Sequence, residues 1–169
     1  MNLYFMRHGI AVDPADPSVS ANEERPLSNK GAKRLRRSAR GMRFLGIPFD
    51  AVLTSPVLRA RQSAEIVAAT LGIESSLEEI SGLAPEGTVE QLLFGLTRYQ
   101  ERQHLLLVGH QPLLGAAIGF LLTHHADNEL DLKLRRGSLC RVEVSALPPT
   151  EPATLHWLLT SKQLRRLGA

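Results

Sequence analysis

Two histidines and two arginines are the residues of this sequence best suited to chemistry, because each lies just after a short apolar run. Arg7 and His8 directly follow the first run, and His110 comes two residues after a later one. Arg59 lies in the first turn of a helix predicted to follow the run at 51–54. A guanidinium group keeps its charge at any working pH, and its planar fork matches phosphate oxygens. Together with two helix N-termini, whose free N–H groups favour anions, these side chains predict a phosphoryl-binding site.

The elements that must bring these residues together are short buried strands. Apolar runs at 3–6, 51–54 and 105–108, with a less apolar run at 78–80, alternate with amphipathic stretches of helical period. This alternation indicates a mostly parallel sheet covered by helices on both faces, a three-layer α/β/α sandwich. Ligands bind at the carboxyl ends of the strands in such sheets, so we expect the four side chains to converge at one edge.

Four helices are predicted between the strands, and their ends carry recognisable capping residues. Ser28 should cap the first helix, and Ser55 and Gly72 should bound the second. Thr88 and Gln91 form a capping box for the third, while the fourth begins near position 112 and is apolar nearly all round. Beyond them, alternation at 139–144 and an apolar run at 155–159 predict a terminal hairpin with an antiparallel edge strand.

The composition narrows the class of protein. With 169 residues, of which 43% are hydrophobic and 22% charged, the chain matches one globular domain spanning residues 1–169. Its longest apolar stretches fall well short of the roughly 20 residues of a membrane span, and its N-terminus does not resemble a signal peptide. The lone Cys140 excludes an internal disulfide and fits a reducing compartment. We therefore expect a cytoplasmic protein without membrane association.

The four residues could instead have a structural role or hold a metal ion. Buried arginines without an anion need carboxylate partners, and Asp13, Asp16 and Glu65 are nearby candidates, although none follows a strand in the equivalent way. A metal site built from His8 and His110 is disfavoured, because two adjacent guanidinium groups would repel the cation. We therefore expect neither a metal ion nor another cofactor.

Four segments of the sequence resemble, in order and spacing, the motifs of the histidine phosphatase (phosphoglycerate mutase-like) superfamily. They are residues 5–9 (FMRHG), 25–31 (RPLSNKG), 55–64 (SPVLRARQSA) and 108–112 (VGHQP). An Arg-His-Gly triplet alone would be weak evidence, but four motifs in register over essentially the whole chain are specific. Within the superfamily, the compact length and the RPLS segment most resemble the short SixA-type phosphohistidine phosphatases.

This resemblance implies a role for each matching residue. His8 would be the nucleophile that takes the phosphoryl group onto its imidazole, and water would then release phosphate without a metal ion. Arg7, Arg59 and His110 would bind the non-bridging oxygens in a loose, in-line transition state. Arg25 matches a family arginine near the pocket mouth and would bind substrate. To attack, His8 must be neutral at its reacting nitrogen, so its other nitrogen should donate to a fixed acceptor such as a backbone carbonyl.

One segment departs from the pattern of the larger family members, which place a carboxylic acid after the third strand to protonate the leaving oxygen. Here residues 81–87 contain Glu86 as their single acid, and SixA-type members similarly lack a dedicated acid. Because a protonated imidazole leaves more readily than an alkoxide, the expected substrate is phosphohistidine on a phosphotransfer protein, with Glu86 a surface residue. The alternatives are a small-molecule phosphomonoester phosphatase, favoured if Glu86 faces the pocket, and a non-catalytic phosphoryl-binding module, against which the two histidines weigh.

The first predicted helix is strongly basic. Seven of the chain's twenty lysines and arginines lie within positions 30–43, namely Lys30, Lys33, Arg34, Arg36, Arg37, Arg40 and Arg43. Such a run is usually a solvated helix face, and the alternative is a docking strip for an acidic or phosphorylated partner. Nucleic acid is not an expected partner, because the net charge is only +3 and no aromatic side chains are interleaved for base stacking.

Overall fold

Six strands form one mixed sheet in the computed structural model, which describes residues 1–125, 130 and 132–169. The strands are β1 (Asn2–Arg7), β2 (Ala51–Thr54), β3 (Leu77–Glu79), β4 (His104–Gly109), β5 (Leu139–Glu143) and β6 (Thr154–Leu159). Their order across the sheet is β3-β2-β4-β1-β5-β6. The first four in this order are parallel, β5 is antiparallel to β1, and β6 is antiparallel to β5. The predicted parallel sheet with a C-terminal antiparallel edge is confirmed.

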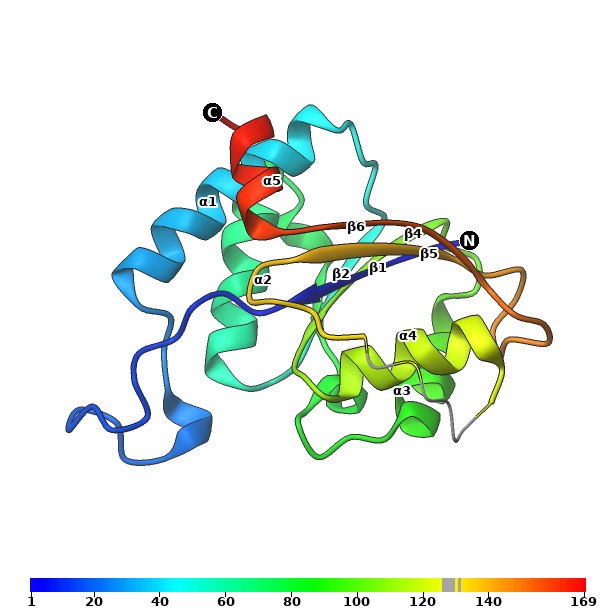
Figure 1. The fold of residues 1–169 in the computed structure, drawn as a ribbon, viewed down its shortest axis with the longest axis horizontal. Helices are drawn as coiled ribbons and strands as arrows, with labels where there is room; N and C mark the ends of the chain where they lie inside the picture. The colour runs from blue at the N-terminus through cyan, green and yellow to red at the C-terminus, as the bar shows by residue number, and fades with distance from the viewer. Residues whose placement is uncertain (126–129, 131) are drawn as a thin grey trace.

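Helices cover both faces of this sheet, which confirms the three-layer sandwich (Figure 1). On one face lie α1 (Asn29–Phe44), α2 (Leu58–Leu71) and α5 (Ser161–Leu167), and on the other lie α3 (Val89–Leu96) and α4 (Leu113–Thr123). Short 3-10 turns occur at Asn22–Glu24, Glu74–Ser76, Ser81–Leu83 and Thr97–Tyr99. Within the described ranges, no helix combines the length and the apolar character needed to cross a bilayer.

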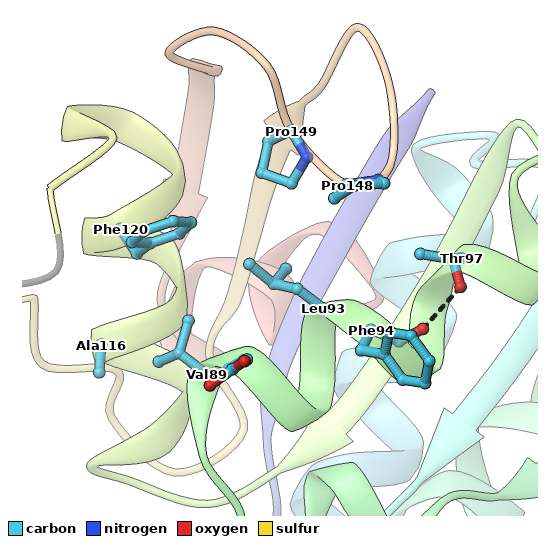
Figure 2. Close-up of a pocket in the computed structure, with 9 residues that line it drawn as sticks. Val89, Leu93, Phe94, Thr97, Ala116, Phe120, Pro148 and Pro149 are labelled. Atoms are coloured by element: carbon cyan, nitrogen blue, oxygen red, sulfur yellow. Dashed lines mark hydrogen bonds between the residues drawn. The ribbon is translucent and has the colours of Figure 1, made fainter.

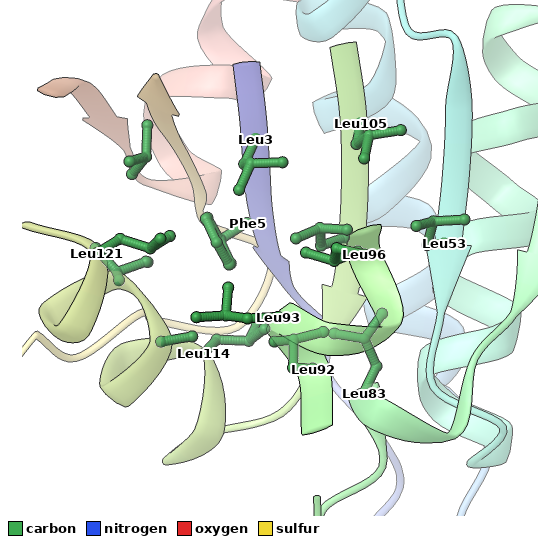
Figure 3. Close-up of a cluster of buried hydrophobic side chains, with 14 of the residues drawn as sticks. Leu3, Phe5, Leu53, Leu83, Leu92, Leu93, Leu96, Leu105, Leu114 and Leu121 are labelled. Carbon is green, nitrogen blue, oxygen red and sulfur yellow. The ribbon is translucent and has the colours of Figure 1, made fainter. Parts of the chain in front are cut away.

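The central strands are buried on both faces, which explains their continuous apolar runs. In β1, Leu3 and Phe5 point into the core beneath α3 and α4, whereas Tyr4 and Met6 pack toward α1 and α2. Figure 3 shows the first of these cores, where leucines of α3 and α4 meet Leu3 and Phe5. Each fully buried side chain of this size contributes about 1.5–3 kcal/mol. The strand ends that carry the chemistry are therefore fixed by packing on both sides.

Most predicted helix ends are observed. Ser28 accepts a hydrogen bond from the Gly31 amide at the start of α1, and Gly72 ends α2 in the left-handed conformation with φ of 75°. The Thr88–Gln91 capping box opens α3 as predicted. These local signals work because each satisfies backbone groups that the helix itself leaves unpaired.

Three features of the fold differ from the sequence-based expectation. The start of α2 is capped by Val57 without a side-chain hydrogen bond, so the prediction that Ser55 caps this helix was wrong. The third strand lies one residue earlier than predicted, because β3 is a half-exposed edge strand without a continuous apolar run. Helix α5 was not predicted, although Thr160 and Gln163 form a capping box at its start.

Candidate active site

The two histidines lie side by side at the carboxyl ends of the neighbouring strands β1 and β4. Arg7 and Gly109 are register partners across these strands, and the His8 amide donates to the Gly109 carbonyl at 3.1 Å. One residue further on, the imidazole rings of His8 and His110 have centroids 5.1 Å apart. Both side chains are almost completely buried. The predicted convergence at this edge is therefore present in the structure.

Arg59 reaches the same point from the first turn of α2. Its Nε donates to His8 Nε2 at 3.3 Å, and its Nη1 donates to the Asn22 carbonyl at 2.8 Å. Ser63, one helical turn later, fixes this geometry from both sides. Its hydroxyl donates to the Arg59 carbonyl at 2.6 Å and accepts from the Gly9 amide at 3.0 Å. The loop after β1 and helix α2 are thus held together directly behind the nucleophile candidate.

The hydrogen bonds of His8 define its tautomer. Nδ1 lies 2.7 Å from the Gly9 carbonyl oxygen, which can only accept, so Nδ1 must carry the proton. Nε2 then presents a lone pair toward Arg59. Burial lowers the pKa of His8 to about 3, with the charges of His110, Arg59 and Arg7 acting in the same direction against the Gly9 hydrogen bond. The expected donation to a backbone carbonyl is observed, and His8 is neutral at physiological pH.

His110 is held by Ser55, the residue that does not cap α2. Its Nε2 lies 2.9 Å from the Ser55 hydroxyl, which also accepts from the Val57 amide at 3.2 Å. Its other nitrogen, Nδ1, is buried without a hydrogen-bond partner among the described residues. Burial, reinforced by Arg59 and Arg7, lowers the pKa of His110 to about 4. A polar atom left unpaired in this way is available to a ligand.

Neither arginine of the site forms an ion pair with a carboxylate of the described residues. Arg7 donates from Nη1 to the Leu134 carbonyl at 3.0 Å, but its buried Nε has no partner within the described part of the chain. Desolvation lowers the pKa of both Arg7 and Arg59, with further lowering by Arg136 for the first and by Arg25 for the second. Glu23 opposes the shift at Arg59 but does not reverse it.

The acids considered as structural partners are used elsewhere. The carboxylates of Asp13 and Asp16 accept from the turn residues that follow them, and Glu65 pairs with Arg61 at 3.9 Å. The ion pairs found among the described residues therefore leave the site arginines free of carboxylates. Two clustered cations without counter-charge are costly in a folded protein unless an anion binds there.

Two further arginines lie close enough to act on the site electrostatically. Arg25 uses its Nε and Nη2 on the Val12 carbonyl at 3.0 and 2.7 Å, and its Nη1 on the side chain of Asn22 at 3.0 Å. It thus holds the loop whose Asn22 carbonyl receives Arg59. Arg136 was not predicted, because it lies in a loop without periodic pattern that is brought to β1 by the Gly137 amide on the Arg7 carbonyl.

Comparison with known proteins identifies the family of this chain. The model of the histidine phosphatase superfamily (branch 1) matches residues 3–92, more than half of the chain. The matched stretch contains Arg7, His8 and Arg59. The chain belongs to the histidine phosphatase superfamily.

Individual proteins are similar to this chain over most of its length. The phosphohistidine phosphatase SixA of Escherichia coli (strain K12) is 34% identical over 125 residues, which cover 72% of this chain and 74% of that protein. An uncharacterized protein of Picosynechococcus sp. (strain PCC 7002) is 46% identical over 131 residues, covering 74% and 77%. The structure of the protein histidine phosphatase SixA complexed with tungstate superposes with a TM-score of 0.83 at 26% identity, covering 97% of this chain and 99% of that one.

The fold also occurs in a structure that is described by a different substrate. A structure described as a putative α-ribazole-5'-P phosphatase from Escherichia coli (strain K-12 MG1655) superposes with a TM-score of 0.75 at 20% identity, covering 95% and 98% of the two chains. At this identity the likeness shows the fold alone. Membership in the superfamily supports phosphatase activity but does not identify the substrate. The substrate must be inferred from the residues around the site.

Glu86, the acid that would favour an ester substrate in this superfamily, is exposed in the structure. It lines a cavity together with Ser81, Gly82 and Gln91, and none of the four site residues lines that cavity. Within the described part of the chain, no three His, Cys, Asp or Glu side chains are grouped closely enough to hold a metal ion.

An apolar cavity that none of the four site residues lines lies between α3, α4 and the turn at Pro148 and Pro149 (Figure 2). Its volume is about 630 Å³, and Val89, Leu93 and Phe120 form much of its wall. These apolar groups cannot bind a phosphoryl group, so the cavity is separate from the chemistry at His8.

Proposed function

We propose that this protein, with residues 1–169 as one histidine phosphatase domain, hydrolyses phosphohistidine on a phosphotransfer protein through a covalent phospho-His8 intermediate. The observation that carries this proposal is the pairing of a neutral His8 Nε2 with a desolvated Arg59 Nε at 3.3 Å. A nucleophile and a cation that both face the same point suit an incoming phosphoryl group. The similarity to SixA-type proteins supports the choice of substrate.

In the first step, the Nε2 lone pair of His8 attacks phosphorus in line with the departing imidazole of the substrate. The new P–N bond to His8 forms as the substrate P–N bond breaks. The departing group is neutral imidazole if its other ring nitrogen already carries a proton, and otherwise it takes that proton from water. His8 keeps its Nδ1 proton on the Gly9 carbonyl throughout. In the second step, water attacks the phosphorus, inorganic phosphate departs, and His8 returns to its neutral form.

The surrounding cations stabilise the charge on the three non-bridging oxygens. Arg59 Nε would move its hydrogen bond from His8 to an oxygen, and the unpaired Arg7 Nε and His110 Nδ1 offer two further positions. At a buried site such donors are worth more than in water, because little solvent competes with them. His110 can donate from Nδ1 once that nitrogen is protonated, which an adjacent phosphoryl group favours.

The leaving group decides between phosphohistidine and a phosphoester. An alkoxide needs a proton from a dedicated acid, and Glu86 is exposed and lines a different cavity. An imidazole can depart as a neutral base after protonation by solvent, so it does not require such an acid. We infer that the site suits P–N bonds better than P–O bonds.

The direct test compares two substrates under equal conditions. A purified phosphotransfer protein phosphorylated on histidine and the generic monoester p-nitrophenyl phosphate are offered to the same enzyme, and kcat/KM is measured for each. We expect the phosphohistidine protein to be preferred at least about a hundredfold, equivalent to ~2.7 kcal/mol of transition-state stabilisation. Equal or reversed preference would favour a small-molecule phosphatase, and no turnover of either substrate would favour a phosphoryl-binding module.

Oxyanion binding gives a second, structural check. Tungstate should occupy the point between Arg7, His8, Arg59 and His110, with oxygens on the atoms that are unpaired in the free protein. A crystal structure with tungstate would show this. An anion bound elsewhere, with these four side chains unaltered, would contradict the proposed site.

A further inference from the structure

Three arginines from different parts of the chain line a small cavity beside the candidate active site. Arg34 comes from α1, Arg136 from the loop before β5, and Arg165 from α5. Gly9 lines the same cavity, and its carbonyl is the group that holds His8 Nδ1. The cavity therefore lies next to the residue that orients the nucleophile.

The charges in this cavity are not neutralised by the described residues that line it. No acidic residue is among them, and Arg34, Arg136 and Arg165 take no part in the ion pairs found in the described ranges. Arg165 donates to the hydroxyl of Ser161 at 2.8 Å, a neutral partner. By contrast, arginines at the β3 edge, such as Arg98 on Glu78 at 3.2 Å, have acids beside them.

The arginines of the cavity also act on one another and on the active site. The pKa of Arg165 is lowered first by desolvation and then by Arg34 and Arg37 of the neighbouring helix. Arg136 lowers the pKa of both Arg7 and Arg59. Arg136, which lines the cavity, thus also acts on the two arginines of the phosphoryl site. Like charges gathered in this way favour the binding of an anion.

The size of the cavity indicates which anion fits. Its volume is about 70 Å³, room for roughly two water molecules. A single side-chain carboxylate matches this space, whereas a nucleobase does not. A planar guanidinium fork is also well suited to two carboxylate oxygens.

We propose that Arg34, Arg136 and Arg165 form a second anion subsite, which binds an acidic side chain of the protein that presents phosphohistidine to His8. The proposal rests on the proposed function for the identity of the phosphoryl donor. It places the recognition of the partner at one defined cavity rather than along the whole basic face of α1. Acidic residues near the phosphorylated histidine would then select the substrate protein.

The test uses two synthetic peptides that carry a non-hydrolysable phosphonate analogue of phosphohistidine. One peptide has glutamates on both sides of the analogue, and the other has glutamines at the same positions. Fluorescence anisotropy gives both Kd values at low ionic strength. For the wild-type protein we expect the glutamate peptide to bind about fivefold or more tightly than the glutamine peptide, and the ratio to shrink at high salt, because the subsite is partly exposed.

Two double variants separate the subsite from general basicity. In Arg34→Gln/Arg165→Gln the ratio of the two Kd values should fall close to one. The matched control Arg36→Gln/Arg43→Gln removes the same charge from exposed positions of α1 that do not line the cavity, and it should keep the ratio. The ratio of the two Kd values is insensitive to partial misfolding, because damage to the protein would weaken the binding of both peptides by the same factor.

Three outcomes decide the matter. Equal wild-type Kd values for the two peptides would overturn the subsite, and so would a control variant that lowers the ratio as much as the cavity variant. A ratio that stays unchanged in the Arg34→Gln/Arg165→Gln variant would also overturn the proposal. Hydrolysis of authentic phosphohistidine is measured separately, so failure of the proposed function would appear as absent turnover with the binding ratio intact.

Discussion

Helix α2 carries two arginines, two residues apart, that meet opposite environments. Arg59 is buried at the carboxyl end of the sheet, where its partners are His8 and a backbone carbonyl. Arg61 faces the β3 edge, where its side chain is 42% exposed and lies 3.9 Å from Glu65 and 3.5 Å from Glu79. The two residues are of the same type and lie in the same helix. Their different environments therefore come from the parts of the sheet that each one faces.

This difference separates structural from functional charge. A surface cation with carboxylates beside it contributes little to the stability of the fold, and its charge is balanced without a ligand. A buried cation without a carboxylate is retained at a cost to the fold, as expected at a site selected for ligand binding rather than stability. Arg34 and Arg165 are only partly buried, but, unlike the arginines of the β3 edge, they take no part in the ion pairs of the described residues.

The largest effect should come from removing one member of this pair. Arg59→Ala should lower kcat/KM for phosphohistidine by two to three decades, or ~3–4 kcal/mol, and weaken tungstate binding, because it removes a donor to the phosphoryl oxygens. Arg61→Ala should change kcat/KM less than about twofold and the free energy of unfolding by about 1 kcal/mol or less. Steady-state kinetics and urea unfolding of both variants measure this contrast. Equal losses of activity in the two variants would contradict it.

A smaller effect concerns pH, because the two buried histidines are neutral in the folded protein. Their folded pKa values are about 3 and about 4, whereas an unfolded histidine has a pKa near 6.5. Above pH 6.5 neither state binds the proton. As the pH falls below 6.5, only the unfolded chain becomes protonated, so stability is lost progressively down to the folded pKa values.

We expect each histidine to reduce the free energy of unfolding by about 1–2 kcal/mol between pH 7 and pH 5. Urea titrations give the free energy of unfolding of the wild-type protein and of His110→Asn at both pH values. The contribution of the His110 ring is the difference between the two proteins in how much this free energy changes from pH 7 to pH 5. A stability that is flat or rises toward pH 5 would show that the rings are solvated or paired with acids.

The smallest effect should come from Glu86, the acid outside the site. Glu86→Gln should change kcat/KM for phosphohistidine less than about twofold, because its carboxyl group lines a different cavity. Assays of phosphohistidine hydrolysis by the variant and the wild-type protein would show this. A hundredfold loss, ~2.7 kcal/mol, would instead identify Glu86 as the acid and move the preferred substrate to a small phosphoester.

Buried periodic elements were predictable from the sequence. The runs that became β1, β2 and β4 are apolar because both faces are covered, and their parallel order brings Arg7, His8 and His110 to one edge. The hydrogen bond from His8 to a backbone carbonyl followed from the chemical need for a defined tautomer. The first prediction rests on the burial pattern of parallel strands, and the second rests on the chemistry of one side chain.

What the sequence did not reveal depends on contacts between distant segments. Ser55 has the type and position of a helix cap, but its hydroxyl is used by His110, more than fifty residues away. Arg136 reaches the site only because its loop bonds to β1. Helix α5 is seven residues long with Leu164 as its buried residue, too short for a periodic signal.

The most direct test of the central claim is to identify the phosphorylated residue during turnover. Wild-type protein is mixed with a histidine-phosphorylated phosphotransfer protein, quenched in alkali, digested and examined by tandem mass spectrometry. We predict one acid-labile phosphoryl group, located on His8, and its absence from a His8→Ala variant that still binds tungstate. A phosphoryl group on His110, or full activity of the His8→Ala variant without any trapped phosphoenzyme, would contradict the covalent mechanism.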